Sequence, residues 1–506
     1  MNIQLKDVDN VVFNGIDVSA VKFNDVLVWR KWEVIEYTGA VPVEITANGE
    51  PLIELLISGN MNQSGVPSPT TPIQPQECGE RMGNLCPATD WEYGQYANGV
   101  WDTTTPNRIT SPFFAVEEGK QYTITINNGT KLSWINLNYF DSNKQWLGNR
   151  STLGMVQFST ASQSETTPNM PTGSAYMRVT VRPYNEVGNI TINDIPTSDI
   201  AVNEGSTALP YEPYGYKLDI SSGGENLFDY QTMALGVSGY YLNSSGEEIS
   251  NAVWRISDYI PCDGKTFTIG KIGGGTPSIC LYDANKNFVT GKSYNTGGAA
   301  VKEDITISSE IAAKYIRFSW YTNDDTATIM LNLGSTAKPY SPYNRTTTPV
   351  YLGEVETTRQ VKELVLDGTE EWRSQYGGWV LSVAKQSGSY TVLSTHYIAT
   401  LSASIDKSIY SNSTNVIIIF DSDYSTLNDF KAYLAQQYAN GTPVCVWYVL
   451  ATPTTGILNE PLRKIGTYAD TLSVPQTIPT VEGENVVDVE TTLKPSEVYI
   501  KYKGKS

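Results

Sequence analysis

Histidine is nearly absent from this chain of 506 residues, which contains one, His396. A single histidine excludes metal sites built from several histidines and most catalytic triads, except one built on His396 itself. The chain has five cysteines, at positions 78, 86, 262, 280 and 445. Their odd number and the lack of C-x-x-C spacing predict neither a zinc site nor a disulfide framework, although Cys78 and Cys86 could close a loop if oxidised. We expect buried thiols, no metal and no cofactor.

Basic residues are also scarce, because 35 Lys and Arg stand against 53 Asp and Glu, a formal net charge of −18. This charge repels a phosphate backbone, so we expect no nucleic-acid partner. No stretch approaches the about 18 consecutive apolar residues of a membrane span. The first twenty residues, MNIQLKDVDNVVFNGIDVSA, lack a basic segment followed by an apolar one. We therefore expect a soluble protein without membrane insertion or signal-peptide export.

The chain is rich in glycine (41), proline (26) and tyrosine (32), and only 17% of its residues are charged. This composition is typical of proteins built from short strands and turns. The length exceeds the roughly 250 to 300 residues at which a single core stops growing, which indicates about three to five domains. We predict an all-β, multidomain chain of tandem jelly-roll β-sandwiches with small terminal hairpin units and one short helix.

A ten-residue motif occurs twice, as GSTALPYEPY at 205–214 and as GSTAKPYSPY at 334–343. Six landmarks in all recur in the same order, which indicates a tandem duplication with module ends near Gly215 and Asn344. We expect the motif to close each module, with its tyrosines clamping the exit strand. The other five landmark pairs are 84–85 and 226–227, 108–110 and 255–257, 119–124 and 264–269, 139–148 and 281–291, and 175–181 and 314–320.

The remaining segments complete a predicted order of six regions. Thr426, with Asp429 at the capping-box position, predicts a helix over about 426–440. Five prolines between Pro67 and Pro75 exclude a central strand or a helix there. The predicted regions are 1–38, an N-terminal hairpin; 39–82, β-strands and a proline-rich strap; 83–215 and 216–344, the two repeated sandwiches; 345–474, a third β-sandwich with the helix; and 475–506, a β-hairpin around 494–496.

Several stretches resemble tail-associated structural proteins of phages that infect Gram-positive bacteria, among them GIDVSAVKFNDVLVW, SGNMNQSGVPSPTTPIQ, LYDANKNFVTG and DFKAYLAQQYANGTPVCVWYVLATPT. The duplicated module looks like the galactose-binding-like, carbohydrate-binding sandwiches of those proteins. The resemblance covers most of the chain. It implies a virion protein of a tail fibre or baseplate, assembled in the host cytoplasm, usually trimeric, anchored to other virion proteins by region 1–38 and contacting host cell-wall or surface polysaccharide.

Sugars are bound by flat aromatic faces together with planar polar groups that meet their hydroxyls. The front of each repeated module is rich in such residues, although the same aromatics could instead fill or cap the sandwich core. The candidate carbohydrate-binding residues are Trp91, Tyr93, Tyr96 and Trp101 in the first module, and Tyr240, Tyr241, Trp254 and Arg255 in the second.

Two acidic patterns imitate calcium sites but favour a simpler interpretation. Asp141 and Asp283 stand in D-x-N-K sequences, which are typical of turns closed by an aspartate side chain. The stretch FDSDYSTLND at 420–429 lacks the glycine and the twelfth-position acid of a calcium loop, and acids before a helix explain it better. No G-x-S-x-G motif occurs, and Ser394 near His396 has no third partner. We expect no enzymatic activity.

Three hypotheses remain. The first is a phage tail fibre or baseplate protein that binds host glycans through repeated sandwiches. The second is a purely architectural virion subunit, such as a head fibre or baseplate scaffold without sugar binding. The third is a glycan-degrading tail enzyme, which the sequence cannot exclude because 53 acidic residues guarantee accidental carboxylate pairs.

Overall fold

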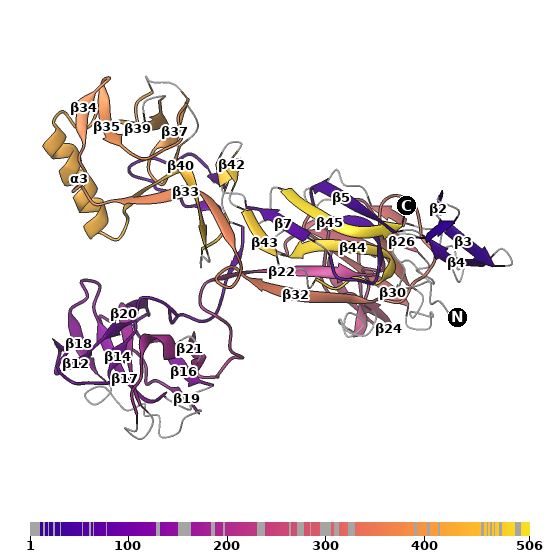
Figure 1. The fold of residues 1–506 in the computed structure, drawn as a ribbon, viewed down its shortest axis with the longest axis horizontal. Helices are drawn as coiled ribbons and strands as arrows, with labels where there is room; N and C mark the ends of the chain where they lie inside the picture. The colour runs from indigo at the N-terminus through magenta and orange to yellow at the C-terminus, as the bar shows by residue number, and fades with distance from the viewer. Residues whose placement is uncertain are drawn as a thin grey trace.

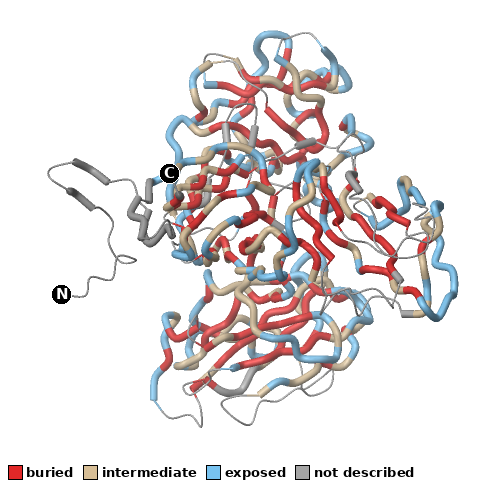
Figure 2. Tube along the Cα trace, turned by 90° about the vertical axis from the view of Figure 1, so that its right-hand side faces the viewer, coloured by how far each residue is buried: buried red, intermediate tan, exposed pale blue. Residues whose placement is uncertain are grey.

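The computed structural model describes residues 11–505, with gaps of five or more residues at 150–162, 230–237, 271–277, 294–304, 308–312, 322–328 and 491–496 and shorter gaps elsewhere. Strands dominate the part described, in which the one α-helix is α3, Leu427–Ala439. The fold is therefore all-β, as predicted. Buried segments run along the strands of every lobe, and exposed segments lie mainly in the connections between them (Figure 2).

A twelve-stranded sheet forms the centre of the molecule and joins ranges from both ends of the chain. Apolar residues from most of its strands pack in one core that includes Ile45, Leu218, Val487 and Ile500. The predicted regions 39–82 and 475–506 thus share a sheet, and how the six regions divide into domains stays a prediction. The order is β10 (Glu80–Arg81), β22 (Tyr216–Gly223), β44 (Glu482–Glu490), β6 (Val43–Asn48), β45 (Glu497–Lys505), β7 (Glu54–Ser58), β43 (Thr471–Val474), β33 (Thr357–Leu366), β40 (Val444–Gly456) and β36 (Leu393–Ser394), with β32 (Arg345–Tyr351) on β22 and β5 (Trp32–Gly39) on β45.

The two repeated modules have the same strand order, a six-stranded sheet and a three-stranded sheet. Each pair of sheets encloses its own core. In the first module the orders are β11 (Glu92–Tyr93), β14 (Ile109–Thr110), β20 (Tyr176–Pro183), β17 (Leu132–Phe140) and β18 (Trp146–Asn149) with β15 (Phe114–Ala115) on β20, and β19 (Gln163–Thr166), β16 (Tyr122–Ile126) and β21 (Ile200–Glu204). In the second they are β23 (Ser238–Leu242), β24 (Glu248–Ile256), β30 (Tyr315–Tyr321), β27 (Ser278–Tyr282) and β28 (Phe288–Ser293) with β25 (Ile260–Pro261) on β30, and β29 (Ile305–Ile307), β26 (Phe267–Gly270) and β31 (Met330–Leu333).

One buried asparagine closes the first module. The side-chain amide of Asn84 donates to the carbonyl oxygens of Ile200 (3.2 Å) and Glu212 (3.1 Å). Its Oδ1 accepts from the backbone N–H groups of Cys86 and Val202, both at 3.0 Å. These four bonds tie the incoming chain to the last strand, β21, and to the second half of the repeated motif.

Asn226 repeats this arrangement in the second module. Its amide donates to the carbonyl oxygens of Ile329 (3.1 Å) and Ser341 (2.9 Å), and its Oδ1 accepts from the N–H groups of Phe228 and Leu331, both at 3.1 Å. Two tyrosines of the motif, at positions 340 and 343, stay 38% and 37% exposed. An asparagine amide therefore ties the exit stretch to the module, and the clamping role of the motif tyrosines stays a prediction.

Paired strands connect both modules to the central sheet. The N–H of Met82 donates to the carbonyl of Gly215 (2.9 Å), and the N–H of Gly224 donates to that of Asn344 (2.8 Å). Directly beyond these bonds, β10 pairs with the start of β22, and β22 pairs with β32 along its length. The two modules therefore leave the central sheet at opposite ends of β22.

The third lobe holds the helix. A five-stranded sheet of β34 (Arg373–Gln375), β35 (Gly378–Ser382), β39 (Val416–Phe420), β38 (Ser408–Ser411) and β37 (Ile398–Ala399) faces β33 and β40. Phe430 and Leu434 of α3 pack in the core between them. The hydroxyl of Thr426 accepts from the N–H of Asp429 (3.2 Å), so the helix begins at the predicted capping residue. In Figure 1 this lobe and the first module lie on the same side of the central sheet.

Two small hairpins precede the central sheet, β1 (Val11–Phe13) with β2 (Ile16–Val18) and β3 (Ala20–Phe23) with β4 (Val26–Arg30). The proline-rich strap contains β8 (Asn62–Gln63) paired with β9 (Pro75–Gln76), and the N–H of Ile73 donates to the carbonyl of Thr395 at 2.9 Å. The strap therefore runs against the third lobe. The predicted C-terminal turn at 494–496 lies outside the described residues.

Replacing Asn226 with Asp tests the closing interaction, because aspartate keeps the accepting oxygen but loses both donated hydrogen bonds and opposes two carbonyl oxygens. We expect the second module to lose about 2 to 4 kcal/mol of local stability, measured in the full chain as faster hydrogen exchange of the β31 amides. Asn243→Asp is the matched control, since Asn243 accepts from two N–H groups in an exposed turn. Equal hydrogen-exchange rates of the β31 amides in the two variants would contradict the role of Asn226 in closing the module.

A second prediction concerns the base of the second module. A Cβ at Gly223 would lie 2.0 Å from the carbonyl oxygen of Asn344, and the φ of Gly223 is +138°. We expect Gly223→Ala to separate β22 from β32 and to accelerate proteolysis there. Gly334→Ala serves as the control, because Gly334 has a φ of +89° but open space around it, so only about 1 kcal/mol of backbone strain is added. Similar digestion rates for both variants would refute the steric explanation.

Candidate functional site: a repeated cluster of cations and aromatic rings

The outer face of each six-stranded sheet carries a buried arginine. In β20, Met177, Val179 and Val181 point into the module core. Because side chains alternate along a strand, Arg178 lies on the opposite face, which we call the outer face. Its side chain is nevertheless only 4% exposed. A buried guanidinium requires polar partners and covering groups, and the surrounding residues supply both.

Arg178 is held by one carbonyl, one carboxylate and three aromatic rings, those of Phe113, Trp101 and Tyr96. Its Nε donates to the carbonyl oxygen of Ser111 (2.5 Å), and its guanidinium lies 3.4 Å from the carboxylate of Glu92. The guanidinium carbon is 4.8 Å from the ring centre of Phe113 and 5.0 Å from that of Trp101. These are cation–π distances, so the charge is stabilised by the rings as well as by hydrogen bonds.

Arg317 of β30 has the same surroundings in the second module. Its Nε donates to the carbonyl oxygen of Ser257 (3.0 Å), and its Nη1 donates to the carboxylate of Glu248 (2.9 Å). The guanidinium carbon lies 4.6 Å from the ring centre of Tyr259. The arrangement has therefore been kept in both copies, although the covering ring has changed from phenylalanine to tyrosine.

An exposed lysine extends each cluster. Lys144 Nζ lies 5.0 Å from the ring centre of Phe113 and 5.7 Å from that of Tyr176. In the second module, Lys286 Nζ lies 4.8 Å from the ring centre of Tyr259 and 5.9 Å from that of Tyr315. We call each group of two cations and two rings the cation–aromatic cluster; its members are Phe113, Lys144, Tyr176 and Arg178 in one module and Tyr259, Lys286, Tyr315 and Arg317 in the other.

The turns that carry these lysines are closed as predicted. Asp141 Oδ1 accepts from the N–H groups two and four residues later, at 2.9 and 2.8 Å, and Asp283 Oδ1 does the same at 2.8 Å in both cases. Both carboxylates therefore serve a turn rather than a metal. Lys144 and Lys286 have φ values of +60° and +63°, a conformation that non-glycine residues seldom adopt. The two copies thus fix the lysine backbone in the same unusual conformation.

Two of the four candidate residues in the first module lie beside its cluster, against Arg178. Tyr96 and Trp101 pack edge to face, with ring centres 5.1 Å apart, and both rings lie over Arg178. Trp91 is instead 4% exposed in the module core, where its Nε1 donates to the carbonyl of Pro87 (2.7 Å). Tyr93 is 55% exposed, and its hydroxyl accepts a bond from the backbone near the module edge.

The candidate residues of the second module are more dispersed. Tyr241 and Trp254 pack against each other with ring centres 5.7 Å apart, but Trp254 is only 8% exposed. Tyr240 is 38% exposed on β23, and Arg255 is half-buried on β24 opposite Trp320 of β30. Binding by these residues and by those of the first module stays a prediction.

Sequence reasoning overlooked the clusters themselves. Arg178 and Arg317 stand at the same place in one repeated landmark, and Lys144 and Lys286 stand at the same place in another. The aromatic partners also occupy matching positions. A comparison of the two copies residue by residue would have identified them, whereas the local abundance of aromatics directed attention to the hairpins upstream.

His396 and Asp421, the residues considered from the sequence for catalysis and for calcium binding, are buried and already bonded. His396 is 1% exposed, burial lowers its pKa, and its Nδ1 is 2.7 Å from the hydroxyl of Thr395. Asp421, in the imitated calcium loop, accepts from Tyr397 and pairs with Lys407. All five cysteines are buried and none forms a disulfide, so the loop between Cys78 and Cys86 is not closed. In the part of the chain described, no group of three or more potential ligands is arranged to hold a metal ion. None of the described helices is long and apolar enough to span a bilayer.

Comparison with known proteins gives a partial similarity. No protein-family model matches the chain. A "Tail fiber protein" of Enterococcus phage phiEF24C is 28% identical over 128 residues, which cover 24% of this chain. Part of the chain is therefore similar to a phage tail fibre protein. The aligned stretch spans only 7% of that protein's length.

Solved structures overlap only weakly with this one. The tandem CBM22 domains of Xyn10C from Paenibacillus barcinonensis are 9% identical, with 58% of this chain and 100% of that chain covered and a TM-score of 0.14. The Gt strain of infectious bursal disease virus is 10% identical, with 94% and 82% covered and a TM-score of 0.13. Similarity at this level supports no inference about fold or function.

Exchanging Glu248 for Gln tests the role of the buried arginine in the second module. The change leaves Arg317 without its carboxylate, and because Glu248 is partly exposed we expect a loss of about 1 to 2 kcal/mol in local stability. Hydrogen exchange of the β30 amides in the full chain measures it. Glu247→Gln is the matched control, since the Glu247 carboxylate accepts from Asn243 at the surface. A loss of the same size in the control would argue against a special role for Arg317.

Proposed function

We propose that this protein is a structural subunit of a bacteriophage tail, in a fibre or baseplate, and that its two repeated modules bind glycans on the host cell surface. The partial similarity to a phage tail fibre protein supports the tail assignment. The glycan assignment rests on one observation, the cation–aromatic cluster that recurs on the outer face of both modules.

The chemistry of the clusters suits sugar ligands. Aromatic faces attract the C–H surfaces of pyranose rings, and Lys144 and Lys286 offer exposed N–H donors beside such faces. The buried arginines keep the rings in place, which lowers the entropy lost on binding. Each module therefore offers a rigid surface with an aromatic part and a hydrogen-bonding part.

Repetition would convert weak binding into firm attachment. Two modules on one chain raise the effective concentration of the second site once the first is occupied. A homotrimer would multiply the effect further, and region 1–38 would attach the chain to other virion proteins. The partners in this proposal are host cell-wall or surface polysaccharide and neighbouring virion proteins, and the protein acts in the phage particle.

A purely architectural role is the second candidate, and one contact favours it. Lys338 Nζ lies 3.0 Å from the carboxylate of Glu44 on β6 and 2.8 Å from that of Glu225. Val486 of β44 also belongs to the core of the second module. The second module is thus packed on the central sheet, as expected for a scaffold. A glycan-degrading activity is the third candidate, and release of reducing ends from host cell walls would reveal it.

Binding of the full chain to an array of host cell-wall polysaccharides tests the proposal. We expect binding to at least one polysaccharide, and we expect Tyr176→Ala and Tyr315→Ala each to weaken it about tenfold, because each removes one ring of a cation–aromatic cluster. Tyr438→Ala is the control, because Tyr438 is 54% exposed but lies on α3, outside both modules. Failure to bind any host polysaccharide would favour the architectural role instead.

A further inference from the structure

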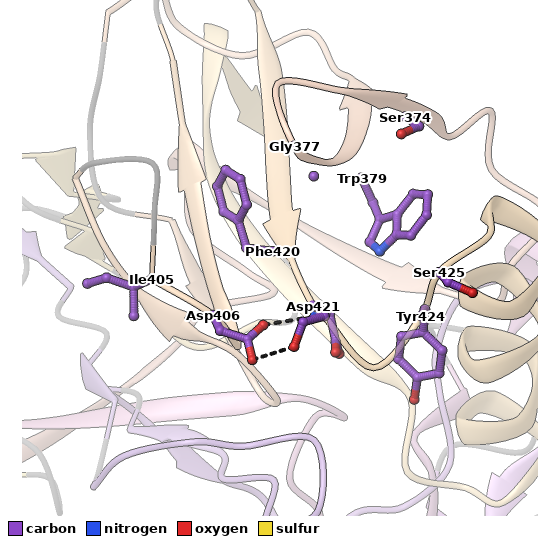
Figure 3. Close-up of a pocket in the computed structure, with 11 residues that line it drawn as sticks. Ser374, Gly377, Trp379, Ile405, Asp406, Phe420, Asp421, Tyr424 and Ser425 are labelled. Carbon is purple, nitrogen blue, oxygen red and sulfur yellow. Dashed lines mark hydrogen bonds between the residues drawn. The ribbon is translucent and has the colours of Figure 1, made fainter.

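A pocket of about 390 Å³ lies in the third lobe, away from both modules. It opens between the β34–β35 hairpin, the turn at 405–406 and the loop 420–425 that leads into α3 (Figure 3). Small-molecule sites have volumes of about 300 to 1,000 Å³. The pocket is at the lower end of this range, so its size suits a ligand of about one ring.

Three aromatic side chains line the pocket, Trp379, Phe420 and Tyr424. Trp379 is stacked on Phe430 of the helix, with ring centres 5.2 Å apart and an angle of 12° between the planes. Tyr424 is stacked on Tyr433 of the same helix, at 4.9 Å and 27°. Because two of the rings are fixed by stacking on α3, the pocket is organised before a ligand arrives.

The indole N–H of Trp379 is a donor without an acceptor. Trp379 is only 7% exposed, and among the described residues none accepts a hydrogen bond from its Nε1. In Figure 3 the nitrogen-bearing edge of the ring is turned toward the side of the pocket where Phe420 and Asp421 lie. Its Nε1 is open to the pocket, unlike the enclosed Nε1 atoms of Trp320 and Trp447, so a ligand can act as its hydrogen-bond partner. Trp372 in the same core has a partner within the protein, because its Nε1 donates to the carboxylate of Glu370 (3.0 Å).

The carboxylate of Asp406 lines the pocket on the side away from Trp379, next to Asp421 (Figure 3). The two oxygens of Asp406 accept from the backbone N–H and from the hydroxyl of Ser422, each at 2.8 Å. These bonds, with a further one from the backbone N–H of Lys407, fix the carboxylate. A carboxylate has about four lone-pair sites, so it can still accept from a ligand. The bonds also lower the pKa of Asp406, so it is ionised at neutral pH. Asp421 is already occupied by Tyr397 and Lys407, and it therefore supports the pocket floor.

We propose that this pocket binds one neutral sugar residue, which lies against the aromatic walls, accepts a hydrogen bond from the Trp379 N–H through one hydroxyl and donates one to the Asp406 carboxylate through another. The carboxylate repels anionic ligands. The N–H edge of an indole is its positive edge, so it disfavours a cation at the same place. The site lies in a different region from the modules and does not depend on their binding glycans.

The test is a titration of the full chain with neutral monosaccharides, namely N-acetylglucosamine, N-acetylgalactosamine, glucose, galactose and rhamnose, followed by saturation-transfer NMR. We expect at least one to bind with a Kd of about 1 mM, as is usual for a ligand of this size. Trp379→Phe and Asp406→Asn should each raise that Kd about tenfold, which is the effect of one lost hydrogen bond to a fixed group.

Two matched controls separate binding from folding. Trp372→Phe removes an indole from the same core but not from the pocket, and Asp367→Asn removes a carboxylate that likewise accepts from a backbone N–H and a hydroxyl, both of Thr369. Both should leave the Kd unchanged. If Trp379→Phe does not fold, Asp406→Asn at the pocket rim still tests the assignment.

Three results would overturn this proposal: no saturable binding of any of the five sugars at up to about 50 mM, an unchanged Kd in both pocket variants, or tighter binding of glucuronic acid or choline than of every neutral sugar. Failure here is distinguishable from failure of the module sites. Tyr176→Ala and Tyr315→Ala change binding to polysaccharide arrays but not this titration, whereas the pocket variants change the titration.

Discussion

A single buried side-chain amide in each module, that of Asn84 or Asn226, holds together the parts on which the rest of the structure depends. Each amide makes four hydrogen bonds, two as donor and two as acceptor. Aspartate lacks the donors, and aliphatic side chains lack both functions. Because these bonds join the incoming chain to the exit motif, the two ends of every module emerge side by side.

Adjacent ends allow each module to be inserted into another sheet without breaking it. The strand β22 serves both modules, since its start pairs with β10 and its full length pairs with β32. Its eight residues span about 26 Å. The modules are therefore separated by the length of one strand, and the central sheet that carries them is completed by strands from both ends of the chain (Figure 1).

The two modules share the same strand order but differ in some of their surface residues. Position 209 in the first module is a leucine that is 52% exposed, whereas the matching position 338 in the second is a lysine paired with two glutamates. The second module is thus bound to the central sheet through Lys338. At the matching position, the first module exposes an apolar side chain. In the proposed function, this difference lets one chain combine a scaffold with an adhesive surface, and the pocket beside Trp379 adds a third point of contact in the third lobe.

Features that depend on neighbouring residues could be predicted from the sequence alone. These include the all-β class, the helix that begins after Thr426, and the turns at Asp141 and Asp283. The tertiary structure decided which distant strands pair and which faces are covered. Alternation along β20 places Met177 and Arg178 on opposite faces. Only the packed neighbours determine that one fills the core and the other anchors a surface cluster, because burial is a property of the surroundings.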